Sequence, residues 1–457
     1  MKIKSKNNAN DGIAKPLGVI KNRIKMRNTL IILTIIFLCG CNNSKKKIEI
    51  PENDWNQAIT AFKELQEALS KEKGKTWNHT LEGPLMFVNR ETRTIIANES
   101  DNSGELMKRE NLFIGKLPEN INIANTAFDW NGKRWTMVAL PLPETKEERL
   151  NLLIHESYHR IQPSIGFESL NEIQSVHLDL KNGRIYLKLE LAALKKALGS
   201  NEPEIHIKNA LLFRQYRYQI IPEAKKAENS LEISEGLAEY TGSILSQRKE
   251  SDLKEHYISK IDWFYSVPTF VRSFPYFTIP VYGYFMQKID KAWNLQIMKD
   301  TNITDFMLQF WNVESQKLTN KDILQLGKEY EIDTIIENEA QREIKIEKLK
   351  NKYKNAFLSD SIVVIGLENM SIGFNTSNIM PLDSFGTVYP YLRITDNWGI
   401  LEVDSCGALI SPEWNKVTIS CPKLITDTLI SGRGWNLKLE KSWKLDFIDN
   451  KYVVTEK

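Results

Sequence analysis

The sequence is poor in cysteine and has no long hydrophobic run. Its 457 residues contain four cysteines, which lie in two close pairs near the chain ends: Cys39 with Cys41, and Cys406 with Cys421. Because no Cys-x-x-Cys occurs, we expect neither a zinc ribbon nor a thioredoxin-like redox site. No apolar run approaches the ~20 residues that a transmembrane helix needs.

The chain also lacks an excess of either charge. Its 61 basic and 58 acidic residues leave a formal net charge of +3. Nucleic-acid-binding domains usually concentrate Lys and Arg, so we expect no nucleic acid partner. The length is sufficient for a large hydrophobic core and for two or three domains.

The N-terminal segment is typical of an export signal. The short apolar run 30–38 follows several basic residues and precedes Gly40 and Cys41. Such a run with a basic flank predicts a secretory signal, and Met26 would open a more typical signal than Met1. The alternative is an uncleaved membrane anchor. Both interpretations place the remaining chain outside the cytoplasm.

The sequence Leu-Cys-Gly-Cys at the end of this segment resembles the bacterial lipobox. The resemblance implies cleavage before Cys41, a lipid on its sulfur, and a signal region over residues 1–41. Residues 42–52 are polar and charged and are expected to form a tether. The resemblance implies a membrane-anchored lipoprotein of the cell envelope. No acidic residue directly follows Cys41, which favours periplasm-facing attachment.

Hydrophobic periodicity predicts the secondary structure of the N-terminal half of the body. Apolar residues at helical spacing predict a helix over 54–71, and short β-rich runs follow over 84–143. Thr126–Trp130 and Lys133–Leu140 flank Asn131-Gly132, which predicts a β-hairpin. A helix is then expected to begin after Thr145, with a capping box completed by Glu148.

The remaining chain divides into a helical and a β-rich part. Residues 168–357 are mostly helical by periodicity, and their last, highly charged stretch is expected to be a solvated helix. From Ser361 onward, apolar and polar residues alternate as in strands. We therefore predict an α+β fold: a small β-rich N-terminal lobe with an edge hairpin, a mainly helical lobe and a C-terminal β-domain. The expected domain boundaries are 53–357 and 358–457.

The helix after Thr145 carries two of the six histidines, one turn apart. His155 and His159, at i and i+4, lie on one helical face, where both can reach one metal ion at the ~2.0–2.1 Å that zinc requires. Glu156 is offset by one residue, so it can act as a general base without binding the metal. The alternative is a pair of ordinary surface histidines.

A third metal ligand is expected from the segment Ser-Glu-Gly-Leu-Ala-Glu-Tyr. Its two glutamates, Glu235 and Glu239, share one helical face, and the small Gly236 and Ala238 allow a neighbouring helix to approach closely. One carboxylate would bind the metal, and the other could orient a histidine ligand by a hydrogen bond to the ring nitrogen that does not bind the metal. Two solvated glutamates are the alternative. His177 could also be a ligand, but no motif surrounds it and a surface or helix-packing role is expected.

His-Glu-x-x-His followed far downstream by Glu-Gly-x-Ala-Glu-Tyr resembles the gluzincin metallopeptidases, most closely the group of alanyl aminopeptidase and leukotriene hydrolase. The resemblance covers residues 120–290. It implies a zincin-like lobe that binds one Zn²⁺ through His155, His159 and Glu235, with Glu156 as general base. A peptide or protein substrate is implied as well.

The same resemblance implies two further features. A catalytic tyrosine is expected in a Pro-Tyr segment after the third ligand, which makes Tyr276 the candidate, with Tyr282 and Tyr284 as competitors. The family also has an edge strand before the zinc helix, and Trp135–Leu140 is well placed to pair with an extended substrate there. The segment with which the family grips a substrate amino terminus is not found, so aminopeptidase specificity is not implied.

Three functions remain open on the sequence alone. The first is a zinc peptidase of the cell envelope. The second is a non-catalytic envelope lipoprotein that serves as a binding or scaffold module with a retained metal site. The third is a zinc hydrolase acting on other bonds. The intact Glu156 favours an enzyme, because a purely structural metal site does not need that residue.

The second cysteine pair flanks a predicted hairpin with its turn near residues 412–415. If Cys406 and Cys421 face each other across adjacent strands, a disulfide is feasible in an exported protein. A slip of one residue in the strand register would aim one sulfur at the opposite face. The sequence leaves both arrangements open.

Overall fold

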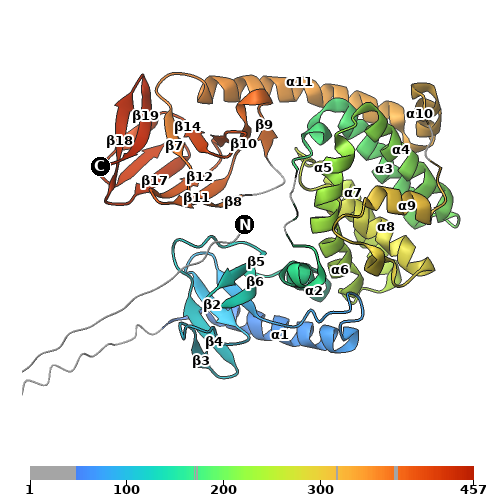
Figure 1. Cartoon of the computed structure of the whole chain (residues 1–457), viewed down its shortest axis with the longest axis horizontal. Coiled ribbons are helices and arrows are strands. Elements are labelled where there is room, and N and C mark those ends of the chain that lie inside the picture. Colours follow the sequence, from blue (N-terminus) through green and yellow to red (C-terminus); the bar gives the residue numbers. More distant parts are fainter. Residues whose placement is uncertain (1–47, 169, 171–172, 315–316, 375–378) are drawn as a thin grey trace, which may run out of the picture. The chain divides into compact units, whose positions relative to one another are not determined.

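The computed structural model describes residues 48–457, apart from 169, 171–172, 315–316 and 375–378. The expected signal region, Cys41 and the tether up to residue 47 lie outside the described residues. Residues Ile48–Lys457 form one compact unit, and the predicted α+β class is confirmed (Figure 1). Among the described residues, no helix is long and apolar enough to cross a membrane.

The N-terminal part is a six-stranded sheet with two helices on one face. Its elements are α1 (Glu52–Glu72), β1 (Leu85–Asn89), β2 (Thr94–Ala97), β3 (Met107–Arg109), β4 (Leu112–Lys116), β5 (Thr126–Trp130), β6 (Lys133–Leu140) and α2 (Lys146–Ile161). Side chains alternate between the two faces, as the period of a strand requires. Leu85 and Phe87 join the core that includes α1 and α2, whereas Met86 and Val88 belong to a smaller core.

The predicted hairpin is confirmed, but the strand expected at the edge of the sheet was the wrong one. Asn131 and Gly132 both have positive φ, 48° and 77°, as a two-residue hairpin turn requires. The strand order is β3-β4-β2-β1-β6-β5. Because β6 also pairs with β1, which lies far away in the sequence, Trp135–Leu140 is an interior strand. The two edge strands of the sheet are β5 and β3.

Helix α2 begins as predicted and packs between the sheet and the helical region (Figure 1). The Thr145 hydroxyl accepts a hydrogen bond from the Glu148 backbone N–H, as expected of an N-cap. The second half of the expected capping box does not form, because the Glu148 carboxylate binds Arg248 and His256 instead.

The helical region surrounds one buried core. Its helices are α3 (Lys181–Gly199), α4 (Pro203–Ile220), α5 (Ala224–Leu231), α6 (Leu237–Leu245), α7 (Glu250–Phe264), α8 (Pro275–Ile289), α9 (Ile303–Phe310), α10 (Asn320–Gly327) and α11 (Ile332–Phe357). Helix α11 is mostly exposed, as predicted, but its Glu339 is buried against Arg184 and Lys188 of α3.

A π-helical turn, Glu232–Gly236, joins α5 to α6. The small residues around it permit the expected close packing. A Cβ atom on Gly236 would lie 2.7 Å from the Ile279 side chain on α8, and one on Gly242 would lie 2.5 Å from the Asn151 backbone oxygen on α2. The π-helical turn is thus held directly against α8, and α6 directly against α2.

Two mostly antiparallel sheets form the C-terminal part, and a hydrophobic core lies between them. One sheet contains β7 (Val363–Gly366), β9 (Met380–Pro381), β10 (Thr387–Tyr389), β13 (Ala408–Ile410), β14 (Lys416–Ile419), β18 (Trp443–Ile448) and β19 (Lys451–Glu456). The other contains β8 (Ser371–Phe374), β11 (Leu392–Asp396), β12 (Gly399–Val403), β15 (Pro422–Ile425), β16 (Leu429–Gly432) and β17 (Trp435–Leu439).

The disulfide considered for this part is not formed, and both thiols are free. Strands β13 and β14 pair Leu409 with Thr418, a register that would reach Cys406 and Cys421 if it continued. It stops at β13, however, because Ser405 and Gly407 have left-handed φ values of 70° and 84° and turn the chain away.

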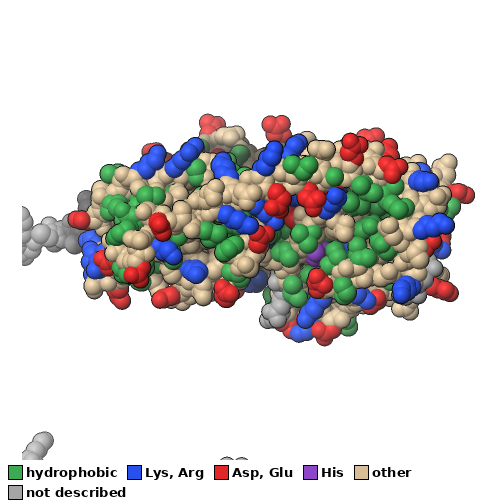
Figure 2. Space-filling model, turned by 90° about the horizontal axis from the view of Figure 1, so that it is seen from above, with side chains coloured by type: hydrophobic (Ala, Val, Ile, Leu, Met, Phe, Trp, Pro, Cys, Tyr) green, Lys and Arg blue, Asp and Glu red, His purple; other side chains and the backbone are tan. Residues whose placement is uncertain are grey.

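Basic and acidic side chains alternate over the face of the molecule shown in Figure 2, with hydrophobic groups between them. The near-equal numbers of basic and acidic residues in the chain are therefore also mixed on this face, with neither charge dominating it.

Candidate metal centre

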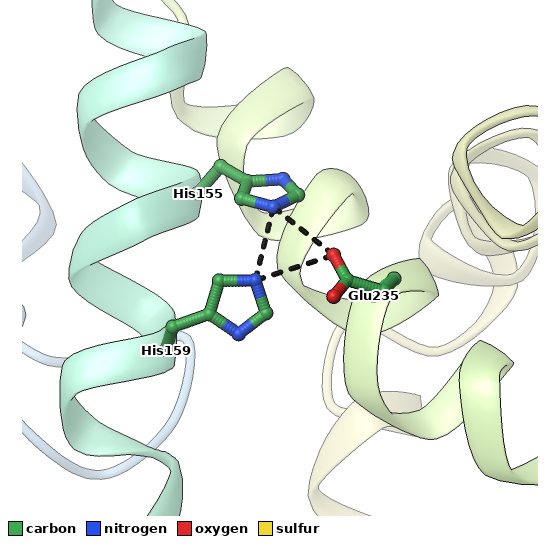
Figure 3. A group of neighbouring side chains, drawn as sticks. All are labelled: His155, His159 and Glu235. Atoms are coloured by element: carbon green, nitrogen blue, oxygen red, sulfur yellow. Dashed lines mark hydrogen bonds and ion pairs between the residues drawn. The ribbon is translucent and has the colours of Figure 1, made fainter. Parts of the chain in front are cut away.

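Side chains from α2 and the π-helical turn converge on one point (Figure 3). His155 Nε2 and His159 Nε2 lie 3.1 Å apart. The Oε2 atom of Glu235 lies 3.5 Å from the first nitrogen and 3.3 Å from the second. These residues, predicted from the sequence as ligands, form a group that can hold a metal ion.

Hydrogen bonds to the Nδ1 atoms of both histidines orient the rings so that their Nε2 atoms face this point. His155 Nδ1 lies 2.9 Å from a Glu239 carboxylate oxygen, which can only accept, so this nitrogen carries the ring proton. Glu239 also accepts from Asn151. It therefore takes the orienting role that the sequence suggested for one of the two glutamates.

His159 is oriented in the same way by a residue that sequence reasoning missed. Its Nδ1 lies 2.7 Å from Oε1 of Gln162. The amide nitrogen of Gln162 donates to the Ser234 backbone carbonyl, which fixes the amide oxygen toward the histidine. In the neutral form of each ring, Nε2 therefore carries the lone pair, and the two lone pairs face each other. Such an arrangement repels unless a cation lies between them.

The charges around the centre favour a cation. Burial lowers the pKa of His155, but hydrogen bonds with Glu235 and Glu239 outweigh burial and raise it to about 10. Burial raises the pKa of Glu235, but His159 and His155 outweigh it and hold it well below its usual range. A positive charge, whether a proton or a metal ion, is therefore stabilised between these side chains.

Glu156 lies next to the ligands and faces a cavity of about 900 Å³, which His155 and Tyr276 also line. Its side chain is almost fully buried, and this burial raises the pKa of its carboxyl, although His155 and His159 oppose the shift. A raised pKa brings a carboxylate closer to the range in which a general base works best at neutral pH.

Of the three tyrosines considered from the sequence, only Tyr276 lies at the centre. Its ring stacks on His155 with 5.5 Å between ring centroids, and its hydroxyl donates to Glu235 Oε2 over 2.5 Å. Burial, followed by the charge of Glu235, raises its pKa well above the usual value, so the phenol keeps its proton. Tyr282 donates to the buried Glu190, and Tyr284 to Glu250.

A buried network of charges braces the π-helical turn that carries Glu235. Arg214 binds Glu232 of this turn with two nitrogens, at 2.8 and 2.7 Å, and it also binds Glu190. Thr278 of α8 donates to the same Glu232. In a regular helix, residues 232, 235 and 239 would share one face, because their spacing of three and seven residues returns to it. The wider π-helical turn lets Glu232 reach this network while Glu235 faces the histidines.

His177, the other histidine weighed as a ligand, belongs to the same network rather than to the metal centre. Its Nε2 lies 2.8 Å from Glu228, and both side chains are buried. The packing role expected for it is therefore the one observed.

Comparison of the chain with protein-family models, with curated proteins and with solved structures finds no match.

Proposed function

We propose that this chain is a zinc-dependent peptidase of the cell envelope, carried by a lipid-anchored N-terminus. The observation that carries the proposal is the convergence of two imidazole nitrogens and one carboxylate oxygen, with a buried carboxylate and a phenol beside them on one cavity. A purely structural metal site has no use for that carboxylate and phenol. Structural zinc sites are also usually closed by four protein ligands, whereas three are found among the described residues.

The donor set suits Zn²⁺. Two ligand atoms that each lie ~2.0–2.1 Å from a tetrahedral zinc ion are about 3.3–3.4 Å apart. The three separations among His155, His159 and Glu235 are 3.1, 3.5 and 3.3 Å. Two histidines and a glutamate are a known ligand set of catalytic zinc. The resemblance to gluzincin metallopeptidases is consistent with this assignment.

The protein groups around the centre fit the hydrolysis of an amide. When bound, zinc supplies a Lewis acid that polarises a carbonyl and lowers the pKa of water toward ~7. Glu156 accepts the proton of the attacking water and returns it to the leaving amine. Tyr276, which stays protonated, would exchange its hydrogen bond to Glu235 for one to the carbonyl oxygen as negative charge develops there.

Peptide cleavage by zinc-loaded wild type and by Glu156→Gln tests the proposal. The exchange removes the base but keeps the size of the side chain, so we expect turnover to fall ~10²–10⁴-fold at unchanged zinc content. Glu144→Gln, in the loop before α2, is the control and should cleave like the wild type. Equal, negligible turnover in all three proteins with zinc bound would instead favour the non-catalytic scaffold.

A further inference from the structure

The cavity in front of Glu156 contains a lysine whose charge the described chain leaves without a close partner. Lys260 of α7 lines this cavity together with His155, Glu156 and Tyr276. Its side chain is partly buried, and among the described residues it takes part in no hydrogen bond or ion pair. An ammonium group that has lost part of its water without gaining a protein partner is favourably placed to bind an anion.

The two carboxylates on which the charge of this lysine acts already have other partners. Glu148 binds Arg248 at 2.5 Å and His256 at 3.2 Å. Glu239 accepts from His155 and Asn151, at 2.9 and 3.1 Å. Lys260 is nevertheless close enough to both carboxylates to contribute to lowering their pKa values. For Glu148 the hydrogen bond with His256 has the larger effect, and for Glu239 burial raises the pKa but His155, and after it Lys260, lower it. Its ammonium therefore lies near the metal centre with its hydrogen-bonding capacity unused.

An apolar surface lies beside the lysine on the same wall. Trp263 follows Lys260 by one helical turn and remains 54% exposed, although it contacts Phe277 with 6.1 Å between ring centroids. Both rings line the cavity. An exposed tryptophan on a cavity wall is well suited to contact an apolar ligand side chain.

A second polar group on this cavity is also unused. The Ser273 hydroxyl belongs to a side chain that is only 5% exposed, and among the described residues it has no hydrogen-bond partner. A carboxylate has two oxygens and can accept bonds from an ammonium and a hydroxyl at once. The unused donors and the apolar surface together suit a carboxylate next to an apolar side chain.

We propose that the cavity binds the C-terminal end of a peptide, with Lys260 binding its free carboxylate and Trp263 contacting its terminal side chain. The inference rests on the proposed peptidase function and assigns a substrate class to the same site. Hydrolysis then breaks a C–N bond close to the carboxyl terminus. Water supplies a hydroxyl to the carbonyl carbon and a proton to the amine, which leaves as the C-terminal residue or short C-terminal fragment.

Two peptides of identical sequence, each with an apolar last residue, test this assignment: one ends in a free carboxylate and the other in an amide. A charge-assisted hydrogen bond contributes about 1.5–3 kcal/mol, so we expect the wild type to show a KM ~10–100-fold higher for the amide. Lys260→Met should raise the KM of the acid to that of the amide and leave the zinc content unchanged. Lys254→Met, on the same helix but outside the cavity, should preserve the wild-type preference.

Equal KM values for acid and amide in the wild type would overturn the proposal, as would a preference that survives in Lys260→Met. A merely structural role of Lys260 would affect both peptides alike. If the wild type cleaves neither peptide, the peptidase assignment fails by itself. The binding of the fluorescently labelled acid and amide, followed by anisotropy, then decides the carboxylate site independently.

Discussion

At the scale of single residues, the metal centre depends on which nitrogen of each imidazole carries the proton. Glu239 and Gln162 hold the Nδ1 protons of His155 and His159, so in the neutral rings both Nε2 lone pairs face Glu235. Only the first of these supports was visible in the sequence, since Glu239 belongs to the motif of the third ligand. Gln162 lies where α2 gives way to a 3-10 turn, and its orientation depends on a backbone carbonyl 72 residues away.

Tyr276→Phe tests the role of the phenol. Removing one donor to a developing oxyanion typically lowers kcat by ~10²–10³. We expect such a loss at saturating zinc, with little change in KM. Tyr284→Phe is the matched control, because its hydroxyl binds Glu250 away from the metal centre. An unchanged kcat in Tyr276→Phe would remove this residue from the mechanism.

At the scale of secondary-structure elements, the sequence correctly predicted the features that depend on interactions between residues close together in the chain. The Thr145 cap, the Asn131-Gly132 turn and the helical spacing of apolar residues each act within a few residues, and these elements were predicted correctly. The π-helical turn Glu232–Gly236 and the interior position of β6 depend on partners far away in the chain, namely Arg214 and β1. Neither feature leaves a signal in the local pattern.

The buried charge network gives the helical region a predictable response to acid. Glu228 accepts from Arg217 at 2.6 Å, from His177 at 2.8 Å and from Tyr218 at 2.9 Å. Burial raises its pKa, but Arg217 and His177 outweigh burial and hold the pKa well below its usual value. A carboxyl whose pKa is depressed on folding stabilises the protein above its unfolded pKa, ~4.3, and this contribution is lost as the pH falls below that value.

We therefore expect Glu228→Gln to lower the free energy of unfolding at pH 7 by ~3–5 kcal/mol, because it leaves the buried Arg217 guanidinium with only Glu190, an anion that it shares with Arg214. The variant should also lose less stability than the wild type between neutral and acid pH. Urea unfolding at several pH values measures both effects, with the exposed Glu255→Gln as control. Parallel stability curves for Glu228→Gln and wild type would contradict this account of the network.

At the scale of the whole molecule, the C-terminal sheets contribute to the metal cavity. Phe374, Tyr391 and Val403 line it together with His155 and Glu156. Arg393 of β11 holds this wall in place, since it donates to Asn122 over 2.6 Å and to the Glu119 backbone oxygen over 3.1 Å. The sequence predicted a β-rich part after residue 357, but this contact joins residues more than 270 positions apart and could not be predicted from periodicity.

Arg393→Ala tests whether this wall matters for the substrate. We expect a higher KM with an unchanged zinc content, because the ligands lie in α2 and the π-helical turn and do not depend on the C-terminal sheets. Arg433→Ala, in the exposed turn between β16 and β17, is the control. Wild-type kinetics in Arg393→Ala would show that the C-terminal part does not shape the cleft.

The most direct test of the account is the zinc content and zinc affinity of the purified protein, measured against a competing chelator. We predict one zinc ion per chain in the wild type and in His79→Ala. We also predict a loss of affinity in Glu235→Ala that exceeds the ~10–100-fold typical of outer hydrogen-bond partners, with the fold intact by circular dichroism. Wild-type zinc affinity in Glu235→Ala would contradict the proposed centre.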